Sequence, residues 1–330
     1  LTTIRSMLLL FLACNTPGSE TPAEPPTPPE QQELVYSRIQ SPQIGDGFGS
    51  AVVIGSSVFV GAPNTPNGRV YRISPENDAA LFFEESTPGA AGSALAFHPD
   101  GRLLIGAPLF DDGAGRVYAN TEVLQDGGRV LGGRIIARGE DLFVTESFGL
   151  WENGAYQALE HRIFSVEKWG ETTVLGHAFG ETAIVVGDQA ISRMTAHDEL
   201  GYALCAANFD DDPEDELAIG APGAGKVYIL NPEDSLDKAM VIDVGEGRFG
   251  HSLACTDGLL LVGGPSLGEE LRGGAWCFQG KMDTWSTQAP TYQGQAWEQL
   301  GTAVALQQNT MVIGAPGNAN TRGSAHLITW

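Results

Sequence analysis

The stretch LAIGAPGAGKVYIL, Leu217 to Leu230, determines how the rest of the chain is interpreted. Four residues separate Gly220 from Gly225 and Lys226, which is the spacing of a phosphate-binding loop. Such a loop ends in Ser or Thr, which reaches magnesium, and it opens a helix. Here position 227 is Val, and the segment VYIL predicts a strand. We therefore expect no nucleotide site, and the glycines need another explanation.

The same pattern recurs along the chain, so this stretch is one copy of a repeat. Five apolar runs end in Gly-Ala-Pro or a close variant: VFVGAP from Val58, LLIGAP from Leu103, LAIGAP from Leu217, LLVGGP from Leu260 and MVIGAP from Met311. Two weaker copies, LFVTES from Leu142 and IVVGDQ from Ile184, fill the longest gap. The chain therefore contains seven copies.

Two further elements accompany most copies. A glycine precedes the run in FGSA from Phe48, AGSA from Ala91, LGYA from Leu200, FGHS from Phe249 and LGTA from Leu300. A third element follows it in GRVYRI, GRVYAN, GKVYIL, GGAWCF and GSAHLI. Each unit thus predicts a strand, a buried second strand ended by proline, and a third strand.

These features predict an all-β, seven-bladed β-propeller over residues 34–330. A strand between two blades is buried on both faces, so it is a continuous apolar run. Glycine lets its backbone approach the next blade closely. Because the last repeat ends without an outer strand, we expect Leu34–Ile39 to pair with AHLIT at the chain's end and close the ring.

The three elements resemble the FG-GAP repeat, which builds the seven-bladed N-terminal propeller of integrin α subunits. The resemblance covers Leu34 to Trp330. The fourth copy departs from it, since only DQAISRMTAHDEL separates Gly187 from Gly201. That segment is short for two further strands, so blade four is expected to have three strands. A six-bladed ring with an irregular insert is the alternative.

The fifth repeat carries the acidic insert NFDDDPEDE, from Asn208 to Glu216. In many FG-GAP repeats this loop binds calcium through alternate residues, so the resemblance implies one structural calcium ion. Its ligands would be the side chains of Asn208, Asp210, Asp212 and Glu216 and the carbonyl of Glu214. Oxygen ligands at this spacing suit a hard cation. A solvated acidic loop is the alternative, because Pro213 stands where the family has glycine.

The first residues, LTTIRSMLLLFLAC, resemble a bacterial lipoprotein signal peptide. Residues 1–13 would be removed and Cys14 would be lipidated. The proline-rich and acidic residues 14–33 would form an extended tether. This predicts a lipid-anchored protein of the bacterial cell envelope, at the outer membrane or cell surface.

The net charge limits the class of partner, and the cysteine content predicts the number of disulfides. The net charge of −23 argues against nucleic acid as a partner. After Cys14 the chain has three cysteines, Cys205, Cys255 and Cys277, so one disulfide and one free thiol are expected in an oxidising compartment, without a determined pairing.

The sequence contains no catalytic signature such as H-E-x-x-H or G-x-S-x-G. We therefore expect a non-enzymatic adhesion or recognition module that binds an extracellular protein or glycan, as the resemblance to integrin heads implies. An exported propeller hydrolase or lyase, with residues assembled across blades, and an envelope-assembly scaffold are the alternatives.

Overall fold

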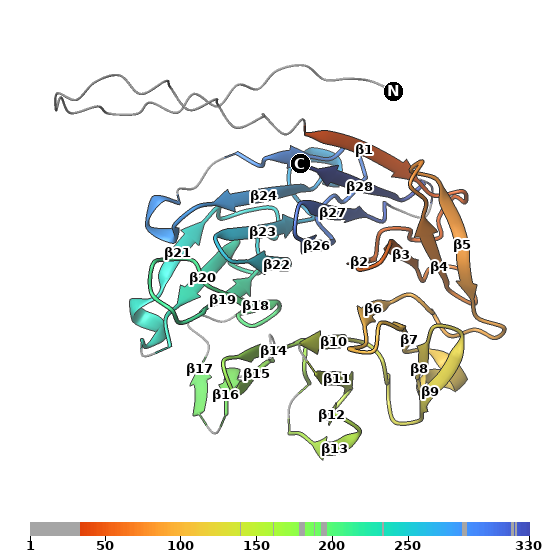
Figure 1. The fold of residues 1–330 in the computed structure, drawn as a ribbon, viewed down its shortest axis with the longest axis horizontal. Coiled ribbons are helices and arrows are strands. Elements are labelled where there is room, and N and C mark those ends of the chain that lie inside the picture. The colour runs from red at the N-terminus through yellow and green to blue at the C-terminus, as the bar shows by residue number, and fades with distance from the viewer. Residues whose placement is uncertain are drawn as a thin grey trace, which may run out of the picture. The chain divides into compact units, whose positions relative to one another are not determined.

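The computed structural model describes residues 34–138, 140–160, 162–177, 182–187, 189–192, 197–232, 234–285, 289–317, 320 and 322–330. Within this part, Leu34 to Trp330 forms one compact unit. Its strands build seven antiparallel sheets of four strands each, arranged in a ring (Figure 1). The protein is therefore an all-β, seven-bladed β-propeller, as the repeat predicts.

In each blade the first strand lies innermost. Blade 1 consists of β2 (Ala51–Ile54), β3 (Val58–Ala62), β4 (Arg69–Ile73) and β5 (Ala79–Glu84). Blade 2 consists of β6 (Ala94–Phe97), β7 (Leu103–Ala107), β8 (Arg116–Ala119) and β9 (Glu122–Asp126). Blade 3 consists of β10 (Ile135–Arg138), β11 (Asp141–Glu146), β12 (Gly149–Glu152) and β13 (Ala155–Ala158). Blades 4 and 5 consist of β14 (Ser165–Trp169), β15 (Thr172–Gly176), β16 (Thr182–Val186) and β17 (Gln189–Ser192), then β18 (Leu204–Ala207), β19 (Glu216–Ala221), β20 (Lys226–Leu230) and β21 (Met240–Asp243).

Blades 6 and 7 complete the ring. They consist of β22 (Ser252–Thr256), β23 (Leu259–Gly264), β24 (Gly274–Gln279) and β25 (Tyr292–Gln293), then β26 (Ala303–Gln307), β27 (Thr310–Ala315), β28 (Ser324–Thr329) and β1 (Val35–Gln40). Short helical turns lie in the loops, namely α1 (Phe110–Gly113), η1 (Leu236–Lys238), η2 (Glu269–Leu271) and η3 (Met282–Thr284).

The hydrophobic core is divided into seven clusters, each between two neighbouring blades. Every residue of β7 and β19 is buried, because a second strand has a blade on both sides. The cluster between blades 5 and 6 is the largest, with fifteen buried residues. Among the described residues, the cluster between blades 3 and 4 is the smallest, with five. Stability is therefore shared among seven unequal interfaces.

The repeated glycines meet each other across these interfaces. A Cβ on Gly61 of β3 would lie 2.0 Å from the carbonyl oxygen of Gly92, which precedes the next blade. Gly220 has the same relation to Gly250, at 2.1 Å. Real Cβ contacts are never so short, so any side chain would push the blades apart. This close approach is the structural reason for the glycines.

The ring closes as the sequence predicts. β1 pairs with β28 in an antiparallel register that sets Val35 opposite Thr329 and Gln40 opposite Ser324. The N-terminal strand is thus the outermost strand of blade 7 (Figure 1). The pairing covers a sheet edge that would otherwise be free.

The prediction for blade four was wrong, and so was its six-bladed alternative. Blade 4 has four strands, because its second strand is Thr172–Gly176 and the IVVGDQ copy contributes the third strand, Thr182–Val186. Gly176 is the true repeat glycine, since its Cβ would lie 2.0 Å from the Gly201 carbonyl oxygen. The signal was hidden because Gly-His-Ala follows the run in place of Gly-Ala-Pro.

Candidate functional site

The acidic loop from Asn208 to Glu216 links β18 to β19 in blade 5. Asp210, Asp212 and Glu216 each bring a carboxylate oxygen to within 4.8 Å of the other two. Hard divalent cations bind such groups of oxygen atoms. The three carboxylates could therefore hold a metal ion.

Glu216 is the most informative member of this cluster because it is fully buried, with an exposed fraction of 0%. Its Oε2 accepts a hydrogen bond from the Phe209 N–H at 2.6 Å, and its Oε1 has no hydrogen-bond partner among the described residues. Burial, with the negative charges of Asp210 and Asp212, raises the pKa of the Glu216 carboxyl to about 7. A cation beside Oε1 would supply the missing partner and offset the repulsion.

Hydrogen bonds within the loop set its shape. The Asp212 N–H donates to Asp210 Oδ1 at 2.7 Å, and the Glu214 N–H donates to Asp212 Oδ1 at 3.0 Å. Turns of this kind form when a carboxylate bonds the backbone two residues later. Positive φ angles are absent from residues 208–216, so the fixed φ of Pro213 fits this loop. The missing glycine is therefore compatible with the turn.

The other two predicted ligands have a bracing role in the structure. The side-chain amide of Asn208 donates to the carbonyl of Asp212, and to the carbonyl of Glu214 at 3.3 Å. The structure thus clusters three of the five predicted residues. The remaining two predicted ligands, Asn208 and Glu214, are joined to each other by a hydrogen bond.

Blade 6 holds the base of the acidic loop. The Asn208 N–H donates to Asp257 Oδ1 at 3.3 Å, and the Asn208 carbonyl accepts from the Gly258 N–H at 2.8 Å. The Phe209 carbonyl accepts from the Met282 N–H at 2.7 Å. The start of the loop is therefore fixed by the β22–β23 turn and by η3 of the next blade.

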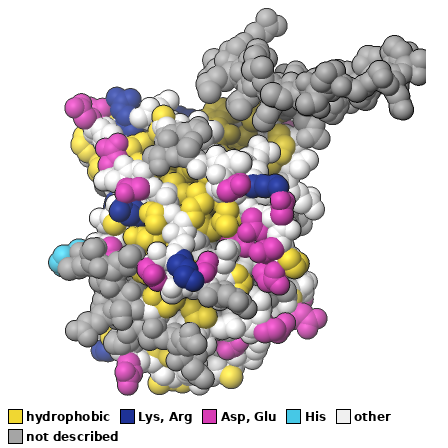
Figure 2. Space-filling view, turned by 90° about the vertical axis from the view of Figure 1, so that its left-hand side faces the viewer, with side chains coloured by type: hydrophobic (Ala, Val, Ile, Leu, Met, Phe, Trp, Pro, Cys, Tyr) yellow, Lys and Arg dark blue, Asp and Glu magenta, His cyan; other side chains and the backbone are white. Residues whose placement is uncertain are grey.

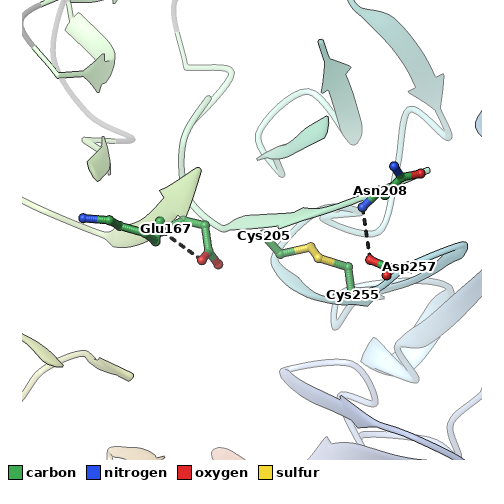
Figure 3. The surroundings of a disulfide bond; sticks show 6 residues. Glu167, Cys205, Asn208, Cys255 and Asp257 are labelled. Atoms are coloured by element: carbon green, nitrogen blue, oxygen red, sulfur yellow. Dashed lines mark hydrogen bonds between the residues drawn. A yellow bond between two sulfur atoms is a disulfide. The ribbon is translucent and has the colours of Figure 1, made fainter. Parts of the chain in front are cut away.

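A disulfide between Cys205 and Cys255 joins the same two blades, with 6.2 Å between the Cα atoms. Figure 3 shows it beside the hydrogen bond from Asn208 to Asp257. Cys277 is the free thiol among the described cysteines, and burial raises its pKa to about 11. The expected single disulfide is therefore confirmed, and its pairing is now determined.

The two loop faces of the ring differ in their exposed apolar side chains. One face, here called the channel face, carries the loops between second and third strands and the loops that lead into the next blade. Five large apolar side chains are exposed in these loops, namely Ile44, Leu109, Phe148, Leu271 and Trp297. The other exposed large hydrophobic side chains of the described residues lie on or beside outermost strands, and none of them lies in the loops of the opposite face.

Acidic side chains are spread over the flank of the propeller that Figure 2 shows, with few basic ones among them. This distribution agrees with the net charge of −23. It makes an acidic polymer an unfavourable partner for this flank.

The innermost strands enclose a cavity of about 890 Å³. At the channel face it is lined by Arg134, Phe164, Tyr202 and His251, which the sequence analysis did not single out. Tyr202 and His251 directly follow a repeated glycine, and Phe164 holds the same place in blade 4 after Ile163, so this position is the signal that points to the three rings.

Several predictions from the sequence concern residues 1–33, so Cys14, the signal peptide and the tether lie outside the described residues. In the part of the chain that is described, no helix has the length and apolar character needed to cross a bilayer.

Comparison with known proteins supports the fold. No protein-family model matches the chain. It is 27% identical to phosphatidylinositol-glycan-specific phospholipase D of Rattus norvegicus over 209 aligned residues, which cover 51% of this chain and 24% of that protein. This chain thus spans about a quarter of that relative's length. The crystal structure of virginiamycin B lyase from Staphylococcus aureus superposes with a TM-score of 0.60 at 11% identity, over 90% of this chain and 100% of that one.

Proposed function

We propose that this protein is a non-enzymatic, lipid-anchored recognition module of the bacterial cell envelope whose propeller binds a protein or glycan ligand at its channel face. The observation that carries the proposal is the placement of Ile44, Leu109, Phe148, Leu271 and Trp297 on that face. Exposed apolar side chains gathered in loops are typical of binding surfaces. Resemblance to the FG-GAP propeller of integrins supports the same function.

A structural calcium ion at Asp210, Asp212 and Glu216 is part of this proposal. The buried, unpartnered oxygen of Glu216 and the clustered carboxylates support it. Calcium accepts six to eight oxygen ligands, so backbone carbonyls of the loop would complete the set. An ion there would hold the β18–β19 hairpin against blade 6. The acidic loop lies on the face opposite the channel face, so we assign the ion a structural role and not ligand recognition.

Lipidation of Cys14 would place the propeller at the outer membrane or cell surface. Expression of the full chain in a bacterium should give a membrane-associated product that detergent releases. Cys14→Ser should abolish lipid labelling. Labelling that survives this change would contradict the anchor.

Binding of the full chain to arrays of glycans and extracellular proteins tests the recognition function. We expect that a variant with Phe148→Ser and Trp297→Ser, both on the channel face, loses the binding. A matched variant with Leu81→Ser and Tyr156→Ser, on outer strands β5 and β13, should retain it. Equal loss in both variants would contradict a channel-face site. Chemical conversion of a bound ligand would favour the alternative of an exported hydrolase or lyase.

A further inference from the structure

In three blades the residue after the repeated glycine stabilises the turn that leads into the innermost strand. In blades 1, 2 and 7 it is Ser50, Ser93 and Thr302. Each hydroxyl donates to a carbonyl three residues earlier, at distances of 2.7, 2.7 and 2.8 Å. The side chain thus braces the turn that leads into the innermost strand.

Blades 4 to 6 have rings at this position instead of hydroxyls. Phe164, Tyr202 and His251 are half-buried and line the cavity at the channel face. The ring centroids of Phe164 and Tyr202 lie 5.7 Å apart, and those of Tyr202 and His251 lie 4.8 Å apart. We call these three residues the aromatic arc.

The turns in blades 5 and 6 do not need the rings. The Tyr202 N–H donates to the Glu199 carbonyl at 3.1 Å, and the His251 N–H donates to the Arg248 carbonyl at 3.1 Å. The backbone therefore keeps the turn after the hydroxyl is lost. Blades 4 to 6 thus share a departure from the hydroxyl of blades 1, 2 and 7, and in blades 5 and 6 the turn does not require the ring, which points to a role for the rings in the cavity.

Positive charges flank the aromatic arc in a chain with 18 basic and 41 acidic residues. Arg134 donates from Nε to the Phe164 carbonyl at 3.0 Å, and the Arg162 guanidinium lies 5.0 Å from the Phe164 ring centroid. Neither guanidinium forms an ion pair with a described carboxylate. Arg248, 5.6 Å from the Tyr202 ring centroid, is paired with Glu199. Arg134 and Arg162 therefore have charge available for a ligand.

The arc also offers hydrogen-bonding groups. The Tyr202 hydroxyl lies 3.2 Å from His251 Nε2. Burial, with the positive charges of Arg134 and Arg248, lowers the pKa of His251 to about 4, so the imidazole is neutral at pH 7. A neutral imidazole and a phenol both donate and accept hydrogen bonds, which suits a ligand with hydroxyl groups.

We propose that the aromatic arc, with Arg134 and Arg162, binds the carboxylated ring of a uronic acid residue in a glycan. The apolar face of a sugar ring would pack on the aromatic rings, and a guanidinium pairs with a carboxylate through two hydrogen bonds. The cavity of about 890 Å³ has the size of sites that take ligands of a few rings. This inference rests on the proposed recognition function and names its ligand class.

Calorimetric titration of the full chain with trigalacturonate tests it, with the carboxyl-reduced trisaccharide as the matched ligand. We expect the acidic sugar to bind at least about tenfold more tightly than the reduced one, since the reduced sugar lacks the charge-assisted bonds. Arg134→Gln and Tyr202→Ala should each weaken binding of trigalacturonate about tenfold or more. Arg72→Gln, which removes a charge on β4 away from the cavity, should change it less than twofold.

Absence of binding, equal binding of the two sugars, or an unchanged affinity of Arg134→Gln would each overturn this inference. The melting temperature of every variant should match that of the natural chain, which separates lost binding from lost folding. The proposed function has a separate test, because an array ligand that depends on Phe148 and Trp297 would support recognition even if trigalacturonate did not bind.

Discussion

Glu298 Oε1 accepts a hydrogen bond from Arg38 Nε at 2.8 Å, although the two residues are 260 positions apart in the chain. Arg38 lies on β1, and Glu298 lies in the loop that leads into blade 7. His326 Nε2 on β28 lies 2.8 Å from the same carboxylate oxygen, and the Tyr36 hydroxyl lies 2.6 Å from His326 Nδ1. A carboxylate only accepts, so Nε2 of His326 carries a proton and donates to Glu298. Polar bonds that are wholly or partly buried thus join β1 to β28 and to the loop that leads into blade 7.

Deletion of residues 1–32 should leave the melting temperature unchanged, because it retains β1. Deletion of residues 1–41 should lower it markedly, since it exposes the edge of β28 and removes Arg38 from Glu298. Differential scanning calorimetry of the two truncated chains compares them directly. Equal melting temperatures would show that β1 does not stabilise the ring.

Acid should weaken this closure through Glu298. Burial alone would raise the pKa of its carboxyl, but the hydrogen bonds from His326, the Gln295 N–H and Ser324 outweigh burial and hold it well below the ordinary value. Because the pKa of Glu298 is lower in the folded state, the carboxylate stabilises the fold fully at pH values above the unfolded pKa of about 4.3. This contribution is lost as the pH falls from there through the folded pKa.

We therefore expect the free energy of unfolding to fall by about 1 kcal/mol more in the natural chain than in Glu298→Gln between about pH 6 and about pH 3.5. Urea unfolding at both pH values measures this difference. The variant should already be less stable at about pH 6, because glutamine leaves Arg38 without its charged partner. Identical pH dependence in both proteins would contradict the role of Glu298.

Calcium should stabilise the natural chain but not a variant with Asp210→Ala and Asp212→Ala. Extracellular sites of this kind have Kd values of about 10⁻⁴ to 10⁻³ M, so 10 mM calcium should add roughly 1.5 to 3 kcal/mol by mass action. The measurement is thermal unfolding with calcium and with a chelator. Asp111→Ala with Asp112→Ala, in the polar turn of blade 2, is the matched control and should respond like the natural chain. An equal calcium shift in all three proteins would place the ion elsewhere.

Gly220→Ala should destabilise the ring by several kcal/mol, because the new Cβ would lie 2.1 Å from the Gly250 carbonyl oxygen. Gly133→Ala is the control, since its nearest neighbour would be the Val130 carbonyl oxygen at 3.4 Å, an ordinary contact. Unfolding in urea should show a large effect for the first change and a small one for the second. Similar small effects would mean that the blades adjust easily.

Loss of the disulfide should cost about 2 to 4 kcal/mol, because the bond closes a 50-residue separation in the unfolded chain. The comparison is between the natural chain and Cys205→Ala with Cys255→Ala. Cys277→Ser should have a smaller effect, since the Cys277 thiol forms no disulfide. A loss of calcium response in the disulfide variant would further show that the bond holds the base of the acidic loop.

The sequence predicts the ring well because its signals are local and repeated. Gly61 and Gly220 identify second strands, because the second strand of each copy contacts the next blade too closely for a side chain. Blade 4 was misaligned because Ile163 stands where the repeat has glycine and because Gly176 is followed by His-Ala and not by Ala-Pro.

The candidate sites were predictable to different degrees. The acidic loop is contiguous, so its spacing predicts the meeting of Asp210, Asp212 and Glu216. The bonds that hold the base of the loop come from Asp257 and Gly258 of blade 6, which lies later in the chain. The aromatic arc brings together Phe164, Tyr202 and His251 from three repeats. No local pattern predicts this cluster until the copies are correctly aligned.

The closing strand also determines where mechanical load enters the molecule. A pull transmitted through residues 1–33 reaches the fold at Val35, which sits opposite Thr329 at the C-terminal end of β28. Six residue pairs join these two strands, and a force at Val35 would separate them one after another, not all at once. Arg38, with its partner Glu298, lies midway along this strand. Separation of β1 that starts at Val35 would therefore reach the Arg38–Glu298 ion pair before it reaches Gln40.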